Sequence, residues 1–227
     1  MKMNDTKIEC LYDLTHTIAK DMIRSFIYPW EVLANIEKTI LELGCKLPKD
    51  EYEARENNVW IHKTATVFPS AYLGKNVIVG KDAEVRHSAF VRENAIIGEA
   101  AVVGNSTELK NVILFDGVEV PHYNYVGDSI LGYKAHMGAG SITSNVRADK
   151  GLVKIHTEDG DIETGRKKVG AMLGDHAEIG CGSVLNPGTV IGRNSNVYPL
   201  SSVRCCVSEN SIYKNQGEIA EKTGEIR

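Results

Sequence analysis

Residues 67–109 decide the fold and read VFPSAYLGKNVIVGKDAEVRHSAFVRENAIIGEAAVVGNSTEL. An aliphatic residue stands at every sixth position of this stretch: Val67, Leu73, Val79, Val85, Val91, Ile97, Val103 and Leu109. A period of six fits neither the 3.6 residues of a helical turn nor the two-residue alternation of an ordinary strand. It is typical of a β-solenoid, in which each six-residue unit forms one short wall and three walls close one coil. The sequence therefore predicts a parallel β-helix with these side chains pointing inward.

The same period extends this stretch in both directions. Aliphatic residues continue it at Ile61, Leu114, Val120 and Val126, and later at Leu173, Ile179, Leu185, Ile191, Val197 and Val203. A small residue follows four positions after most of them, as Ala71, Ala83, Ala89, Ala95 and Ala101 show. We therefore expect one solenoid domain over residues 58–207.

Three segments lie outside the repeat. Residues 1–57 show helical spacing that ends at Gly44, and we expect them to cap the first coil, because an open end would expose the core and strand edges. Residues 146–168 interrupt the repeat and read as a hairpin around Asp159-Gly160. Residues 208–227 read as a polar C-terminal tail.

Composition narrows the functional classes. The net charge of -4 and the pI near 6.0 give no electrostatic reason to expect nucleic acid. The apolar runs are too short for a membrane span, and the first residues resemble no signal peptide. The 5 cysteines show neither metal nor disulfide spacing, so we expect reduced thiols in a cytoplasmic protein.

Arg92 and Lys110 both follow an inward aliphatic residue and are one 18-residue coil apart. This spacing predicts that they stack on one corner, an unfavourable arrangement unless an anion neutralises both. Two solvated cations would have the same spacing, so a phosphate site gains support only from the neighbouring residues.

His122 is the histidine most suited to chemistry. Polar and aromatic residues surround it in Pro121-His122-Tyr123-Asn124-Tyr125, and a glycine-rich run follows one coil later. A histidine zinc site would need three imidazoles, and His87 and His122 lack a third, so we predict no metal.

A family resemblance rests on motifs between Arg92 and Asn145. These motifs are Gly104-Asn105-x-x-Glu108-x-Lys110, His122-x-x-Tyr125-x-Gly127-Asp128 and Gly138-Ala139-Gly140-x-Ile142-Thr143-x-Asn145. The stretch resembles the acetyltransferase domain of the bifunctional glucosamine-1-phosphate acetyltransferase/N-acetylglucosamine-1-phosphate uridylyltransferase. The later segment looks more like archaeal sugar-1-phosphate nucleotidylyltransferases. The resemblance covers most of residues 59–205 and does not extend to the N-terminal piece, which is too short for a uridylyltransferase domain.

That resemblance implies a left-handed parallel β-helix, a homotrimer and acetyl-CoA bound between neighbouring subunits. It makes His122 the general base and Ala139 the backbone donor to the acetyl group. Binding of the sugar phosphate falls to Arg92, Lys110, Tyr125 and Asn145, with Asn145 also near the thioester. Two residues depart from the family: His136 stands where it has an asparagine that contacts the sugar, and Cys181 where it has a serine near the coenzyme.

The insertion adds Arg166, Lys167 and Lys168, cations suited to the coenzyme's phosphates. We expect it to complete the site of a neighbouring subunit. The function expected is acetyl transfer from acetyl-CoA to an amino-sugar 1-phosphate, of glucosamine or galactosamine. The alternatives are a nucleotide-linked amino sugar or another small amine as acceptor, or a non-catalytic sugar-nucleotide scaffold.

Overall fold

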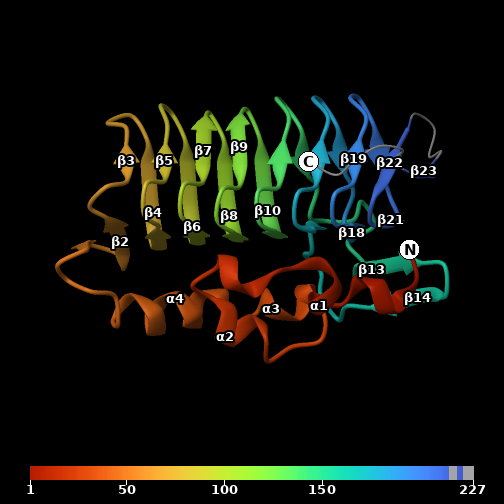
Figure 1. Ribbon diagram of the computed structural model, residues 1–227, viewed down its shortest axis with the longest axis horizontal. Coiled ribbons are helices and arrows are strands. Elements are labelled where there is room, and N and C mark those ends of the chain that lie inside the picture. The colour runs from red at the N-terminus through yellow and green to blue at the C-terminus, as the bar shows by residue number, and fades with distance from the viewer. Residues whose placement is uncertain (215–218, 222–227) are drawn as a thin grey trace.

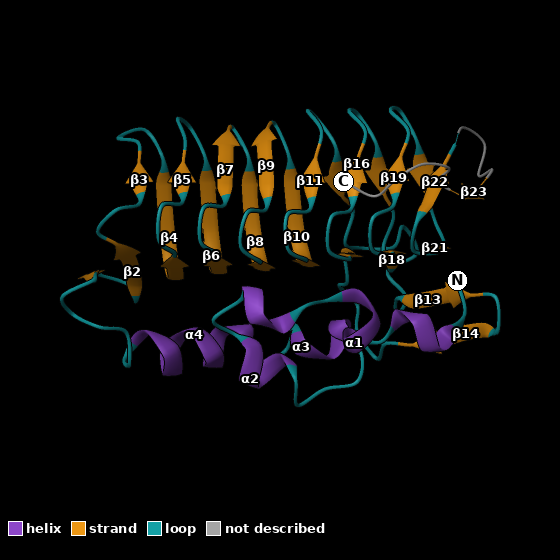
Figure 2. Cartoon of the chain, viewed as in Figure 1, coloured by secondary structure: helices purple, strands orange, loops and turns teal. Residues whose placement is uncertain are grey.

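The computed structural model describes residues 1–214 and 219–221 and consists of a β-solenoid with helices along one side (Figures 1 and 2). Its strands form a 12-stranded and a 9-stranded sheet, parallel except where β1 and β23 are added at the ends. The predicted left-handed parallel β-helix is confirmed. Each coil has three walls joined by corners, and the candidate site residues are described below by the wall or corner on which they lie.

The first wall, here called the Tyr125 wall, runs through β4, β6, β8, β10, β12, β17 and β20. Its outward residues align in register in the order Tyr72, Phe90, Glu108, Tyr125, Ile142, Val184 and Ser202. The strands are β4 (Tyr72–Val79), β6 (Phe90–Ile97), β8 (Glu108–Leu114), β10 (Tyr125–Leu131), β12 (Ile142–Thr143), β17 (Val184–Leu185) and β20 (Ser202–Val203).

The second wall, called the His136 wall, is the 9-stranded sheet. It comprises β3 (Thr66–Val67), β5 (Glu84–Val85), β7 (Val102–Asn105), β9 (Glu119–His122), β11 (His136–Met137), β16 (Glu178–Ile179), β19 (Asn196–Val197), β22 (Ser211–Tyr213) and β23 (Ile219–Glu221). Part of the predicted polar tail therefore adds strands to this wall, whereas residues 215–218 and 222–227 lie outside the described residues.

The third wall, called the covered wall, contains the second halves of β4, β6, β8 and β10. It also contains β2 (Val59–His62), β15 (Ala171–Leu173), β18 (Thr189–Ile191) and β21 (Cys206–Val207). Its outward side chains are apolar as well as its inward ones: Ile78, Ile96, Ile113, Ile130, Met172 and Val190, all buried. Burying one such side chain contributes about 1.5–3 kcal/mol, so this wall needs a cover.

The N-terminal segment supplies most of that cover and corrects the predicted cap. Its helices are η1 (Met3–Thr6), α1 (Ile8–Leu11), η2 (Leu14–His16), α2 (Lys20–Ile23), α3 (Pro29–Val32) and α4 (Ile36–Gly44). They lie along the solenoid rather than over its end, with α4 against β4, β6 and β8 and α3 against β10 (Figure 1). At the first coil, β1 (Tyr52–Arg55) pairs with the edge of β2 as an antiparallel strand. The segment lies along this wall because outward side chains such as Ile78, Ile96 and Ile113 are apolar and are buried by it.

The insertion is a hairpin, as predicted, made of β13 (Lys154–Thr157) and β14 (Gly160–Glu163). It covers the far part of the same wall, where Val153 and Ile155 are fully buried against the later coils. The amino group of Met1 forms an ion pair with Glu158 at the hairpin tip. The hairpin thus rests on its own solenoid.

Candidate functional site

His122, Ala139 and Cys181 share one corner, between the His136 wall and the Tyr125 wall. The Gly140 N–H donates to the His122 carbonyl (2.9 Å), and the Gly182 N–H donates to the Ala139 carbonyl (2.8 Å). These residues therefore occupy equivalent places in successive coils, which stack about 4.8 Å apart. The residues predicted as the catalytic base, the backbone N–H donor to the acetyl group and the coenzyme contact are brought together, and we call this place the His122 corner.

The ligand-facing groups of this corner are exposed. No protein acceptor or donor lies within hydrogen-bond distance of the His122 imidazole among the described residues, and the same holds for the Ala139 N–H. A free imidazole beside a free backbone donor suits proton removal next to a developing oxyanion.

Asn124 connects the two coils at this corner, and the sequence analysis did not identify it as a site residue. Its side chain accepts from the His122 N–H (3.0 Å) and donates to the carbonyls of Gly138 (2.9 Å) and Ser141 (3.0 Å). The signal was present, because Asn124 is an amide at an inward position that other coils fill with alanine, serine or threonine. Its buried amide fixes the backbone at His122 and, in the next coil, on both sides of Ala139-Gly140.

Arg92 and Lys110 do not stack as predicted. Lys110 pairs in register with Glu93, because the strand has an irregularity between Val91 and Glu93 that places Arg92 out of line. Arg92 Nη1 instead bonds Glu108 Oε1 at 2.9 Å. The reason is visible in the spacing of Leu109 and Leu114, which is five residues rather than six.

Lys110 belongs to a buried cluster at the next corner, between the Tyr125 wall and the covered wall. Its Nζ lies 3.6 Å from Asp128 Oδ2, and the side chains are only 16% and 4% exposed. Asn145 Nδ2 donates to the same carboxylate (2.6 Å) and to Tyr125 Oη (3.2 Å). Burial raises the pKa of Tyr125, and the charges of Asp128 and Glu108 add to the rise. We call this place the Asp128 corner.

Backbone conformation explains why amides and Asp128 occupy this corner. Asn76, Asn94, Asn111 and Asp128 all have positive φ, between 48° and 55°, a region in which Asn and Asp are enriched. The turn residues thus carry polar side chains that form a ladder up the corner. Asp128 is the central acceptor of this ladder, a role the sequence did not reveal.

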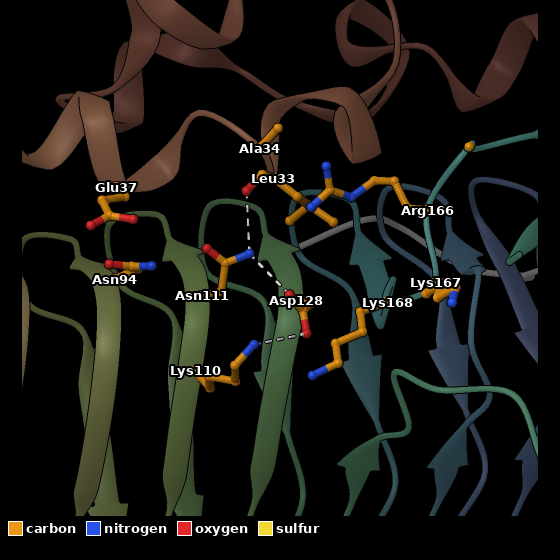
Figure 3. Close-up of a pocket in the computed structure, with 11 residues that line it drawn as sticks. Leu33, Ala34, Glu37, Asn94, Lys110, Asn111, Asp128, Arg166, Lys167 and Lys168 are labelled. Carbon is orange, nitrogen blue, oxygen red and sulfur yellow. Dashed lines mark hydrogen bonds and ion pairs between the residues drawn. The ribbon is translucent and has the colours of Figure 1, made fainter. Parts of the chain in front are cut away.

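A pocket of about 540 Å³ opens beside the Asp128 corner (Figure 3). The solenoid forms its floor, residues 33–37 of the N-terminal segment its roof, and residues 165–168 of the insertion one side. Lys110, Arg166, Lys167 and Lys168 therefore line one cavity, although the first was expected to bind acceptor and the others coenzyme. Among the described residues, none of the three insertion cations has a carboxylate within ion-pair distance, and Arg166 Nε is buried without a hydrogen-bond partner.

The two corners lie at opposite edges of the Tyr125 wall. Asp128 is four positions after Asn124, which corresponds to roughly 13 Å along a strand. Tyr125 and Glu108 face outward between them. A ligand lying across this wall would reach from the imidazole at one edge towards the cations at the other.

His136 joins neither cluster. It lies on the His136 wall in register with Glu119 and Glu178, and its Nδ1 is 2.9 Å from Glu178 Oε2. This hydrogen bond raises the pKa of His136, partial burial opposes the rise, and the charges of Glu178 and Glu119 add to it. Its predicted contact with the sugar stays a prediction.

Other predictions concern metals, membranes and thiols. Within the described ranges, no three His, Cys, Asp or Glu side chains gather as a metal site requires, and no helix has the length and apolarity to cross a membrane. All of Cys10, Cys45, Cys181, Cys205 and Cys206 are free thiols. Burial raises the pKa of Cys206 to about 12, so this thiol is unreactive. The cytoplasmic compartment stays a prediction.

Comparison with known proteins agrees with these motifs. Residues 81–158 match the family described as the GMPPB C-terminal domain. The bifunctional sugar-1-phosphate nucleotidylyltransferase/acetyltransferase of Sulfurisphaera tokodaii is 34% identical over 109 residues, 48% of this chain and 27% of the relative. The bifunctional protein GlmU of Methanococcus maripaludis is 33% identical over 204 residues, 86% of this chain and 48% of the relative. The expected resemblance is confirmed.

The second relative also corrects the extent of that resemblance. The matched 86% of the chain amounts to about 195 of 227 residues, whereas residues 58–227 number 170. The likeness must therefore reach into the N-terminal segment, contrary to prediction. The chain spans half the length of these relatives or less.

Among solved structures, a perosamine N-acetyltransferase mutant from Caulobacter crescentus shows 17% identity and a TM-score of 0.35, with coverage of 83% of this chain and 66% of that one. A likeness at this level does not bear on activity.

Proposed function

We propose that the chain is an acetyl-CoA-dependent N-acetyltransferase that acetylates the amine of an amino-sugar 1-phosphate. The observation that carries the proposal is the pairing of the His122 corner with the cation-lined pocket across one wall. The resemblance to sugar-1-phosphate nucleotidylyltransferase/acetyltransferases and to GlmU proteins supports the same chemistry.

The His122 corner would perform the reaction. A protonated amine is unreactive, and an imidazole, which titrates near neutrality, suits its deprotonation. The freed amine would attack the thioester carbonyl of acetyl-CoA, and the Ala139 N–H would stabilise the oxyanion. Collapse of the tetrahedral intermediate would expel coenzyme A as its thiolate, which would take the proton held by His122, while the nitrogen would release its second proton to water to give the neutral amide. Cys181, on the same corner, would lie against the coenzyme.

The Asp128 corner would hold the acceptor's phosphate. Lys110 and the insertion cations of the pocket would bind it, and Tyr125 and Asn145 would lie along the sugar. Arg92 is already paired with Glu108, so its contribution would need that ion pair to open.

We also propose a homotrimer as the working unit. The chain covers one of its three walls itself, which leaves the two walls that meet at the His122 corner. Large exposed aromatic side chains lie at or near that edge: Tyr72 is 60%, Phe90 43% and Tyr123 65% exposed. Such a patch suits packing against further copies, and sedimentation equilibrium would measure the mass.

Acetyl transfer is tested with acetyl-CoA and a panel of amino sugars and their 1-phosphates, by thiol release and by mass of the product. The proposal expects a product 42 mass units heavier, roughly the mass of an added acetyl group, with the 1-phosphates preferred. Tight binding of a sugar nucleotide without release of the coenzyme A thiol would instead favour the alternative of a non-catalytic sugar-nucleotide scaffold.

A further inference from the structure

The amide ladder of the Asp128 corner breaks inside the pocket. Asn58 Nδ2 donates to Asn76 Oδ1 and Asn76 Nδ2 to Asn94 Oδ1, each at 3.0 Å. The ladder resumes only with Asn111 Nδ2, which donates to Asp128 Oδ1 at 3.0 Å. Between Asn94 and Asn111 the structure gives no hydrogen bond among the described residues, and the coil there is one residue shorter.

The break leaves polar groups without protein partners. The side-chain amide nitrogen of Asn94 and the side-chain oxygen of Asn111 have no hydrogen-bond partner among the described residues, and both residues line the pocket. Glu37 of α4 projects over the same place, where one of its carboxylate oxygens accepts from Asn76 at 3.2 Å. Figure 3 shows Glu37 and Asn94 at one end of the pocket, Asn111 next to them towards Asp128, and Arg166, Lys167 and Lys168 on the opposite side.

The pocket therefore has two chemically different ends. One suits phosphate oxygens, because guanidinium and ammonium groups line it. The other combines a donor, an acceptor and a carboxylate, which suits hydroxyl groups, since each hydroxyl both donates and accepts. A carboxylate that binds vicinal ribose hydroxyls is a recurring feature of nucleotide recognition. The apolar Leu33 and Ala34 complete the roof between the two ends.

The volume of about 540 Å³ is in the range of pockets that enclose whole small-molecule ligands and exceeds the need of one phosphate. We propose that this pocket binds the nucleoside diphosphate part of a nucleotide-linked amino sugar, with the diphosphate at the insertion cations and the ribose hydroxyls at Glu37, Asn94 and Asn111. The idea rests on the proposed function and extends its acceptors to such sugars. It also makes the N-terminal segment a specificity element.

Binding is measured first, on the full chain and without turnover, so that its result does not depend on acetyl transfer. Isothermal titration uses UDP, GDP and ADP, each beside its 2′-deoxy counterpart. At least one ribonucleotide should bind, and its deoxy form should bind about tenfold more weakly through loss of a hydroxyl contact. Glu37→Gln should weaken binding of the ribonucleotide by a similar factor. Glu42→Gln should not, because Glu42 of the same helix does not line the pocket and pairs with Lys38 instead.

Acetylation then compares an amino-sugar 1-phosphate with its nucleoside diphosphate derivative. We expect a lower KM for the derivative, and Glu37→Gln should raise that KM at least tenfold while changing the KM of the 1-phosphate less than twofold. Acetylation of the 1-phosphate with no nucleotide binding would overturn this inference and leave the proposed function intact. Nucleotide binding without any acetylation would overturn the proposed function, and with it the role of the nucleotide as part of an acetyl acceptor, and would leave only a nucleotide-binding pocket. Displacement of the nucleotide by coenzyme A would assign the pocket to the coenzyme and also overturn the inference.

Discussion

Replacing Asp128 by asparagine should destabilise the protein more than an ordinary surface change. The carboxylate is 4% exposed, faces Lys110 at 3.6 Å, and accepts from Asn111 at 3.0 Å and Asn145 at 2.6 Å. Asparagine has the same shape but lacks the charge, and it places an amide donor against one of those donors. Hydrogen bonds to charged groups contribute about 1.5–3 kcal/mol each, and Lys110 would also lose its partner. We therefore expect the free energy of unfolding to fall by about 2–4 kcal/mol.

Urea denaturation followed by circular dichroism measures this change as a lower midpoint at an unchanged slope. Asp82→Asn is the matched control, because Asp82 also has positive φ (55°) but is exposed, so its loss should stay within about 0.5 kcal/mol. In Asp128→Asn/Lys110→Met the two losses should not add, since both remove one interaction. A loss below about 0.5 kcal/mol for Asp128→Asn, or strict additivity, would refute the cluster.

Three further predictions concern the reaction and the edges of the site. His122→Ala should lower kcat by roughly 10²–10⁴-fold with an unchanged circular dichroism spectrum, whereas His87→Ala on the same corner should not; near wild-type turnover would remove His122 from the mechanism. Lys168→Met should raise the KM for a sugar 1-phosphate far more than for the unphosphorylated amino sugar, and equal changes would make Lys168 a bystander. Glu178→Gln should lower the pKa of His136 in an NMR titration, because the Glu178 hydrogen bond raises it. Since that bond favours the imidazolium, its contribution to stability is present below the unfolded pKa and is lost as pH rises through the folded pKa. The wild type should therefore have the larger free energy of unfolding at acidic pH and lose this difference from Glu178→Gln at alkaline pH.

The solenoid was predictable because its signal is periodic. Inward residues such as Val91 and Leu109 repeat at fixed spacing, and one coil of 17 residues likewise places Ala139 above His122. Cys181 follows only 42 positions later, because the insertion lies between them, so its place on this corner cannot be counted from the repeat alone. Two further features of the sequence could have been used to predict the site but were not. The five-residue step from Leu109 to Leu114 marks the slip that separates Arg92 from Lys110. The second apolar ladder, with Ile78 and Ile96 one coil apart, marks the wall that the N-terminal segment covers.

The pocket was not predictable, because segments distant in the sequence build it. Glu37, Asn94 and Arg166 meet only because the N-terminal segment lies sideways and the insertion folds back onto its own solenoid. Periodicity describes contacts between successive coils, whereas these contacts depend on how non-repeating segments pack on one wall. Hence the stacked coils bring together the residues of both corners, whereas the packing of the non-repeating segments forms the pocket beside the Asp128 corner.

The central claim is that the acceptor lies across the Tyr125 wall between the two corners. A crystal structure of the complex with an amino-sugar 1-phosphate and coenzyme A tests it directly. The account predicts the sugar amine within hydrogen-bond distance of the His122 imidazole, about 2.6–3.2 Å, and the phosphate against Lys110 in the pocket. An amine bound away from His122, or a phosphate outside the pocket, would contradict it.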